Sequence, residues 1–320
     1  MATYIARRLV QAIPILLGIT IIMFILAKLL PGDPFTQLLN PQIKSADIAR
    51  MKQAAGLTAP LPVQYWNWLM ALLKGDLGRS ITFNQPVIDV IKDRLGPTVT
   101  LQTMTLIFTL IISIPLGVIL AVRQYSTLDY VVTILTFAGI SMPTFFLGLL
   151  AIKYVALTWK LLPPMGVITP GLQLAFPWNY LDVLKHLLLP ALVLTVTSAA
   201  SIIRYVRASM LEVVRQDFIR TARAKGLHEN RVLYAHALRN ALIPVITILG
   251  LSLPGLFSGG IITEQVFSIP GVGRALYQAI IARDYNVMMG ITTFLAVLTV
   301  LGNLLADVAY AWVDPRIRYD

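Results

Sequence analysis

The residue types that most often carry catalysis or bind metals are scarce in this sequence. Cysteine is absent, so the chain has no thiol nucleophile, no disulfide and no zinc–cysteine site. The three histidines, His186, His228 and His236, are too scattered to suggest a pair of metal ligands. No phosphate-binding loop of the form G-x-x-x-x-G-K-[ST] occurs, so we expect the chain not to bind ATP itself.

One polar stretch, DFIRTARAKGL at residues 217–227, has residue types that suggest a specific role. Asp217 can cap the start of a helix, and Gly226 can end it in a left-handed conformation. The helix between them has about two turns and is roughly 12 Å long. We expect Phe218, Ile219 and Ala222 on one side of it and Arg220, Arg223 and Lys225 on the rest.

A helix of two turns is not stable alone in water and needs a surface to lie on. Its length and shape suit a groove on another protein. The alternative is a basic loop that rests against lipid headgroups. Composition alone leaves both interpretations open.

The elements around this stretch are predicted to be membrane-spanning helices. Of the 320 residues, 57% are hydrophobic and 13% are charged, and the mean hydropathy is +0.75. Soluble domains carry about 25% charged residues, so a bilayer is the solvent that this composition fits. The net charge of +11 is then explained by basic cytoplasmic loops, and we expect no nucleic-acid partner.

Crossing a bilayer core of about 30 Å requires about 20 apolar residues in a helix. Six segments meet or approach this length, which predicts an all-α, polytopic fold. The predicted spans are Leu9–Leu30, Thr98–Val122, Tyr130–Ala156, His186–Ile203, Ala241–Thr263 and Tyr285–Ala306.

The distribution of Lys and Arg predicts the orientation. Arg7 and Arg8 precede the first span and place the N-terminus inside, and six crossings return the C-terminus inside. Segment 204–240 is then a cytoplasmic loop with eight Lys and Arg residues, and segment 31–97 is extracytoplasmic. We expect one transmembrane domain, residues 1–320, without a second domain.

A short helix is predicted over Pro62–Lys74 within the extracytoplasmic segment. Pro62 suits a first turn and Gly75 a C-terminal cap. The predicted apolar face can pack on the bundle or lie in the membrane interface. It contains Val63, Trp66, Leu69, Met70 and Leu73.

Residues 221–240, with TARAKGL followed by HALRN, resemble the cytoplasmic signature of permease subunits in binding-protein-dependent ABC importers. The resemblance is to the dipeptide, oligopeptide and nickel branch, and to the first permease of its pair. It extends over the chain in five further blocks in the family's order. They are PGDP at 31–34, GDLG at 75–78, SMP at 141–143, SIPGVGR at 268–274 and DPRIR at 314–318.

The chain departs from the general signature of these permeases at three positions of the loop. That signature has Glu-Ala-Ala, where this sequence has Arg220, Thr221 and Ala222, and its later Pro is replaced by Arg239. Gly226 matches. The departures fit the peptide branch, but they put in doubt any role carried by that Glu.

The resemblance implies the type I importer permease architecture in the cytoplasmic membrane of a prokaryote. It implies a pore-forming, non-catalytic subunit that moves di- or oligopeptides, with nickel, glutathione or another small solute as alternatives. The implied partners are a second homologous permease, two ATPase subunits that bind ATP and Mg²⁺, an extracytoplasmic solute-binding protein and membrane lipid.

Three sets of candidate residues follow. The resemblance makes 217–227 the coupling helix, with Asp217, Phe218, Arg220, Thr221, Ala222, Arg223, Lys225, Gly226 and Leu227 as contacts to the ATPase. Serines and prolines in membrane-spanning helices can expose polar groups to a water-filled path for the solute. The candidate lining residues are Ser141, Met142, Pro143, Ser252, Pro254 and Ser258, and the candidate contacts to a binding protein are Glu264, Arg274, Arg283 and Asp284.

Two other function classes fit the sequence less well. A transporter coupled to an ion gradient usually has acidic residues at mid-bilayer depth, and the predicted spans contain almost none. An intramembrane serine protease needs a serine and a histidine at the same depth. Ser198 and Ser201 lie within the fourth predicted span, whereas His186 lies at its mouth.

Overall fold

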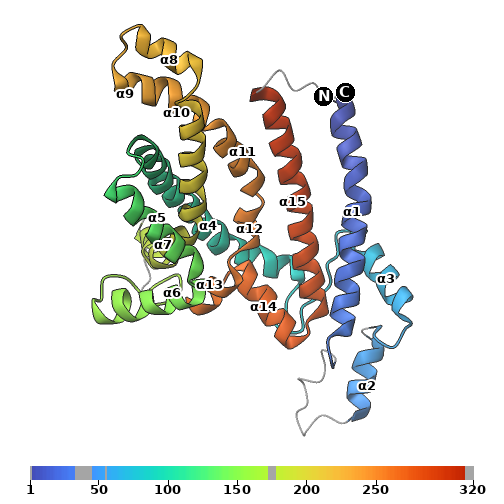
Figure 1. Cartoon of the computed structure of the whole chain (residues 1–320). Helices are drawn as coiled ribbons and strands as arrows, with labels where there is room; N and C mark the ends of the chain where they lie inside the picture. Colours follow the sequence, from blue (N-terminus) through green and yellow to red (C-terminus); the bar gives the residue numbers. More distant parts are fainter. Residues whose placement is uncertain (1, 33–44, 55, 172–177, 314–320) are drawn as a thin grey trace. The chain divides into compact units, whose positions relative to one another are not determined.

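Helices account for nearly all of the structure, as the sequence predicts. The computed structural model describes residues 2–32, 45–54, 56–171 and 178–313. These residues form helices joined by turns, together with one isolated β-bridge between Arg79 and Pro86 (Figure 1). The blocks at 33–34 and 314–318 lie outside the described residues.

Five helices in the described part of the chain are long and apolar enough to cross a membrane. Helices α5 (Thr127–Ser141) and α6 (Thr144–Ala151), the latter extended by the π-helix η2 (Ile152–Thr158), make a sixth crossing if this bent pair counts as one. This confirms the polytopic fold with about six spans. The five are α1 (Ala2–Leu29), α4 (Val87–Val122), α7 (Trp178–Val213), the run Glu229–Gly250 and α15 (Tyr285–Val313).

The run Glu229–Gly250 is built from several consecutive helices, and shorter helices connect the spans elsewhere. The run consists of α9 (Glu229–Arg231), the π-helix η3 (Val232–Ala237), α10 (Leu238–Ala241) and most of α11 (Ile243–Ser252). The shorter helices are α2 (Ser45–Ala54), α3 (Leu61–Leu73), α8 (Asp217–Ala224), α12 (Gly255–Ser258), α13 (Ile261–Val266) and α14 (Val272–Ala282).

Three predicted spans are corrected by the structure. The span predicted at Tyr130–Ala156 is broken at Met142, because Pro143 disfavours helical backbone at the residue before it. The span predicted at Ala241–Thr263 begins at Glu229, because the helix continues through residues whose charges resemble a loop. The span predicted at His186–Ile203 is much longer, since polar turns extend α7 at both ends.

The chain divides into two compact units, which are described separately. The first unit comprises Met1–Thr98, Phe257–Ile261 and Pro270–Asp320. The second comprises Val99–Leu256 and Ile262–Ile269. The boundary near Thr98 falls inside the continuous helix α4.

The first unit is held together by α1, α14, α15 and the start of α4. Helix α1 packs along α15, and α14 packs on the beginning of α15. Since lipid tails are as apolar as these side chains, close van der Waals packing stabilises such contacts within the membrane. The buried residues of this core are Ala27, Val87, Val90, Ile91, Val272, Ala275, Ala279, Val287, Met288 and Ile291.

Helix α3 of the first unit forms where the sequence predicts a short helix, but a different face contacts α1. Its Tyr65 hydroxyl lies 2.9 Å from the Thr20 hydroxyl, and the Tyr65 ring packs edge-on against Phe24. In the predicted apolar face, Trp66 and Leu73 are exposed. Gly75 ends the helix with a φ of +82°, as the sequence predicts.

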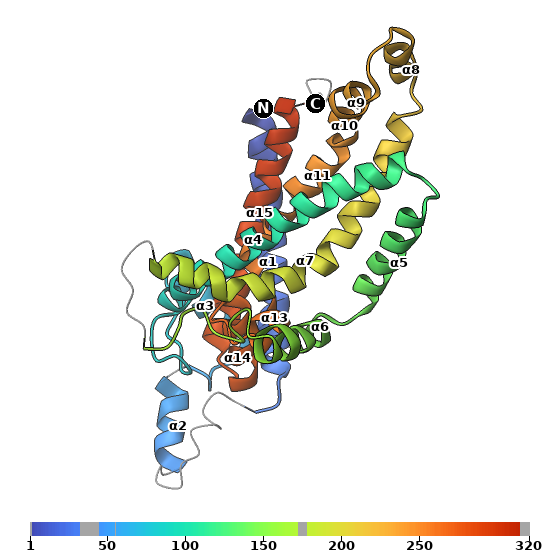
Figure 2. The same ribbon diagram turned by 90° about the vertical axis from the view of Figure 1, so that its left-hand side faces the viewer.

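The second unit is arranged around α7, which packs against α5, α6, α10 and α11 (Figure 2). One core cluster joins α7 to the elements that follow it, and a second joins α7 to α6 and to residues 266–269. The first cluster contains Val118, Ala121, Ile202, Val206, Met210, Val213, Ile219, Ala222, Val232, Ala237, Ala241 and Val245.

Candidate functional site

The predicted two-turn helix is present as α8, with one correction at its start. Gln216, not Asp217, occupies the cap position, and it makes no side-chain hydrogen bond to the cap. Asp217 is the first helical residue. Its carboxylate therefore lies in the first turn, where negative charge interacts favourably with the helix dipole.

The end of α8 is a Schellman motif built on Gly226. Gly226 has a φ of +76°, as the sequence predicts, and its N–H donates to the Arg223 carbonyl at 2.9 Å. The Leu227 N–H donates to the Ala222 carbonyl at 3.4 Å, and the side chains of both residues pack in the same core cluster. This motif turns the chain sharply from α8 towards α9.

Helix α8 is supported by its own chain on one side and exposed on the other. Ile219 and Ala222 are fully buried against the ends of α4 and α7 and against η3. Phe218, predicted on the same side, is 42% exposed. The exposed surface therefore presents one aromatic ring beside the basic residues Arg220 and Lys225.

An ion pair that the sequence analysis did not identify joins α8 to α9. Arg223 donates to the two carboxylate oxygens of Glu229, from Nη2 at 2.7 Å and from Nε at 3.2 Å. This hydrogen bond holds the pKa of Arg223 above its ordinary value. Arg223 thus pairs within the chain, whereas the ion pair that Arg220 makes with Asp217, at 3.4 Å, is exposed.

The helix that follows α8 begins with one turn of α-helix and then becomes the π-helix η3. Val232, Leu233 and Ala237 of η3 are buried, and η3 packs directly on α8. π-Helical turns are rare and occur frequently at functional sites. The two elements that carry α8 are therefore the end of α7 and this irregular turn.

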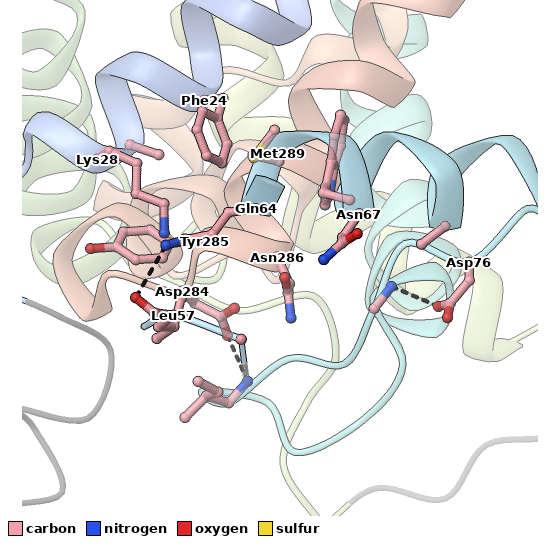
Figure 3. A pocket seen from close by; sticks show the side chains of 16 residues that line it. Phe24, Lys28, Leu57, Gln64, Asn67, Asp76, Asp284, Tyr285, Asn286 and Met289 are labelled. Atoms are coloured by element: carbon pink, nitrogen blue, oxygen red, sulfur yellow. Dashed lines mark hydrogen bonds between the residues drawn. The ribbon is translucent and has the colours of Figure 1, made fainter. Parts of the chain in front are cut away.

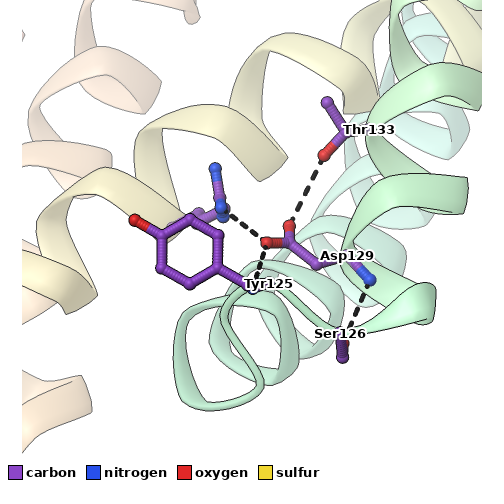
Figure 4. A network of polar contacts seen from close by, with 5 residues as sticks. Tyr125, Ser126, Asp129 and Thr133 are labelled. Carbon is purple, nitrogen blue, oxygen red and sulfur yellow. Dashed lines mark hydrogen bonds and ion pairs between the residues drawn. The ribbon is translucent and has the colours of Figure 1, made fainter.

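A buried polar network lies near the same end of the second unit (Figure 4). Asp129, in the first turn of α5, is 3% exposed and accepts a hydrogen bond from Arg207 Nη2 of α7 at 2.7 Å. It also accepts from the Tyr125 N–H at 3.0 Å, while its own N–H donates to the Ser126 hydroxyl at 3.2 Å. The network ties the turn between α4 and α5 to α7, six residues before α7 ends at Val213.

The candidate lining residues lie at or beside helix breaks. Ser141, Met142 and Pro143 are exposed at the break between α5 and α6. Ser252 is exposed at the end of α11, whereas Pro254 is buried. Ser258 is exposed at the end of α12 in the first unit. Their role in a solute path stays a prediction.

Two of the four candidate contacts to a binding protein are buried. Glu264 is 0% exposed, and Asp284 is 1% exposed. The Asp284 carboxylate accepts from the Ser80 hydroxyl at 2.6 Å and from the N–H groups of Ile81 and Thr82, both at 2.9 Å. Asp284 therefore holds the 80–82 loop to the start of α15, and Arg274 and Arg283 are the more accessible pair.

A cavity of about 340 Å³ lies in the first unit beside this loop (Figure 3). Its charged groups already have neighbours within the unit: Lys28 lies 4.4 Å from the centre of the Tyr285 ring, and Asp76 accepts from the Gly78 N–H at 2.8 Å. The remaining polar lining is mostly amide, from Gln64, Asn67 and Asn286. Among the described lining residues, the charged groups are thus already engaged with neighbours in the first unit.

Comparison with known proteins extends the similarity over the whole chain. The family described as the inner membrane component of binding-protein-dependent transport systems matches residues 113–319, and the family for the N-terminal part of such components matches residues 1–102. An oligopeptide transport system permease of Bacillus subtilis (strain 168) is 46% identical over 320 residues, covering 100% of both chains. A dipeptide transport system permease of Alkalihalophilus pseudofirmus is 39% identical over 336 residues, also covering 100% of both.

A solved structure shows the same fold. It is an inward-facing conformation of the MetNI methionine ABC transporter. The superposition covers 71% of this chain and 97% of that chain, with a TM-score of 0.56 and 19% sequence identity.

Proposed function

The chain belongs to the family of inner membrane components of binding-protein-dependent transport systems, and we propose that it carries di- or oligopeptides into the cell. Its general role follows from the family: it is a multi-pass permease subunit of an ABC importer in a bacterial inner membrane. Support for a peptide substrate comes from the relatives, which are named as oligopeptide and dipeptide permeases over their full length.

The observation that carries the mechanism is the two-sided helix α8. Its buried face is fastened to the protein by Ile219 and Ala222, and its exposed face presents Phe218 between basic residues. Aromatic residues and arginine are enriched at the centres of protein–protein interfaces. We infer that α8 is the coupling helix and that it inserts into a groove of a partner ATPase.

The supports of α8 explain how movement would reach the membrane. Helix α8 follows α7 directly, packs on η3, and is clamped to α9 by the Arg223–Glu229 ion pair. A displacement of α8 is therefore transmitted to two spans together. The proposed cycle uses ATP and Mg²⁺ bound by two ATPase subunits, with this chain contributing no catalytic group.

The proposed assembly also includes a second, homologous permease and an extracytoplasmic solute-binding protein. In this arrangement both termini and the stretch between α7 and α9, which carries α8, face the cytoplasm, and the segment between α1 and α4 faces outside. The solute path would run between the two permeases, near the helix breaks at 141–143 and 252–258. Selection of the peptide would rest largely on the binding protein.

The test uses a matched pair of proline variants. Gly226 and Gly75 each follow a lysine at the end of a helix. Each has a φ near +80°, and its N–H donates to a carbonyl in the last turn of that helix. Proline cannot adopt a positive φ and lacks the N–H. We expect Gly226→Pro to lower both ATPase co-purification and ATP-dependent dipeptide uptake at least tenfold, with unchanged amounts of the chain in the membrane.

Gly75→Pro disturbs the equivalent turn of α3 and is expected to leave ATPase co-purification unchanged. Both variants are produced with the complete set of partner subunits, so that assembly can be measured by affinity purification. Normal uptake by Gly226→Pro would exclude α8 as the coupling element.

A further inference from the structure

The segment formed by α6 and η2, Thr144–Thr158, does not continue the direction of α5. The two helices meet at an angle of 104° at the Met142–Pro143 break. Within the second unit, Figures 1 and 2 both place this segment, called the bent segment here, at the end of α5 and α7 that lies away from α8. Its axis is therefore close to perpendicular to a helix that crosses the membrane.

The length of α5 places this break near one surface of the bilayer. Fifteen residues of α-helix rise about 22 Å, which is most of a hydrocarbon core about 30 Å thick. The beginning of α5 adjoins the turn at 123–126, on the side of α8. The end of α5, and the bent segment with it, then lies at the opposite leaflet.

The bent segment has one face packed into the protein. Gly148 permits close contact there, because a Cβ at this position would lie 3.2 Å from the Phe267 ring and 3.3 Å from Val266. The residues of the packed face are Leu147, Gly148, Ala151, Ile152, Val155 and Ala156.

The opposite face is exposed and combines apolar, aromatic and basic residues. The Lys153 ammonium lies 5.2 Å from the centre of the Tyr154 ring, which in turn packs 6.4 Å from Trp159. The exposed residues of the bent segment are Phe145, Phe146, Leu149, Lys153, Tyr154 and Leu157, and the exposed residues Trp159, Lys160 and Leu161 follow directly after it.

This composition distinguishes a lipid surface from a protein interface. Lysine is depleted at protein–protein contacts, and Lys153 lies in the middle of the exposed face. Tyr, Trp and Lys together are enriched where a protein meets lipid headgroups, because each has an apolar body and a polar end. An in-plane helix with apolar residues towards the acyl chains fits the same location.

We propose that the bent segment lies in the membrane plane, with its exposed face seated at the headgroup boundary of the leaflet opposite to α8. Leu149 and Leu157 contact acyl chains, and the ammonium groups of Lys153 and Lys160 reach lipid phosphates. The segment then sets the depth of α5 and α7 on the side away from the coupling helix. This inference requires only that the chain spans a membrane and is independent of the orientation and of the substrate.

The absence of cysteine permits a direct measurement of depth. Phe146→Cys and Leu157→Cys are each labelled with a nitroxide in the complete transporter, reconstituted in phospholipid vesicles. Depth is measured from collisions with oxygen, which enters the bilayer, and with a water-soluble nickel complex. In a continuous span the two positions, eleven residues apart, would differ in depth by about 16 Å. We expect depths that agree within about 4 Å, less than one helical turn, and good access to oxygen.

Val131→Cys and Ile140→Cys, two exposed positions of α5, are the control, and we expect depths that differ by about 13 Å for nine residues. A spanning gradient between positions 146 and 157 would overturn the proposal. Immobile labels shielded from both reagents would show that the second permease covers this face, and labels reached mainly by the nickel complex would place it in water. Either result would also overturn the proposal.

Discussion

At the scale of single residues, the Asp129–Arg207 ion pair joins α5 to α7. Either charge would be costly to leave buried without its partner. Asp129 satisfies its carboxylate with one guanidinium, one backbone N–H and, at 3.5 Å, the Thr133 hydroxyl. Arg207 Nε is buried without a hydrogen-bond partner among the described residues, so Arg207 depends on Asp129. The pair fastens α7 shortly before it leads into α8.

We predict that Asp129→Asn destabilises the protein by about 3 kcal/mol, the lower end for a broken buried pair, because Arg207 remains partly exposed. The measurement is chemical unfolding of the purified complex in detergent. The double variant Asp129→Asn with Arg207→Gln should be less destabilised than two independent changes would make it. Its loss of unfolding free energy should be at least about 1 kcal/mol smaller than the sum of the losses of the two single variants.

The exposed Asp217–Arg220 contact provides the comparison for this pair. Both side chains are largely exposed, so Arg220→Gln should change the unfolding free energy by less than about 0.5 kcal/mol. Strict additivity of the two changes at positions 129 and 207 would contradict the assigned ion pair.

At the scale of elements, glycine determines how closely α4 and α7 approach in the second unit. A Cβ added to Gly117 would lie 2.6 Å from the Cβ of Val206 and 3.1 Å from the Ile203 carbonyl oxygen. Val206 belongs to the cluster that also holds Ile219 of α8. The packing of these two spans is therefore continuous with the packing that supports α8.

Gly117→Ala should destabilise the protein by about 1–3 kcal/mol, because the added methyl group forces the two helices apart. Gly18→Ala in α1 is the matched variant, since no atom of the described residues lies within 4 Å of its Cβ position. It should be neutral or stabilising by up to about 1 kcal/mol. Equal effects of the two substitutions on chemical unfolding would refute the close contact between α4 and α7.

At the scale of the whole molecule, the proposed function depends on which side of the membrane α8 faces. An even number of crossings places both termini on the side of the basic loop, and counting α5 with the bent segment as one crossing gives six. The positive-inside rule then assigns that side to the cytoplasm. Helices α8 and α3 should consequently face opposite sides of the membrane.

We predict that Lys74→Cys reacts with a membrane-impermeant maleimide in right-side-out vesicles, and that Lys225→Cys reacts only after permeabilisation. The two lysines are matched, because each precedes the glycine that ends its helix, and both are exposed. The reverse pattern of labelling would place α8 outside and remove the basis of ATPase coupling.

Several features of this protein were determined by the sequence alone. The membrane class follows from composition, because bulk charge and hydropathy need no knowledge of contacts. The turns at Gly75 and Gly226 follow from a backbone rule, since glycine accepts a positive φ at low cost. Helices α3 and α8 were placed to within one residue because such stop signals are local.

Other features were decided only by the tertiary structure. The partners Asp129 and Arg207 are 78 positions apart, and Asp284 meets the 80–82 loop across about 200 residues, so no local pattern identifies either contact. The sequence marks Pro143 as a place where a helix can break, but it does not give the 104° angle or the packing of Gly148 against Phe267, a residue more than 100 positions away. Membrane class and turn positions depend on composition and on the backbone preferences of single residues, which the sequence contains. Burial and ion pairing depend on which distant segments of the chain come into contact, which only the tertiary structure gives.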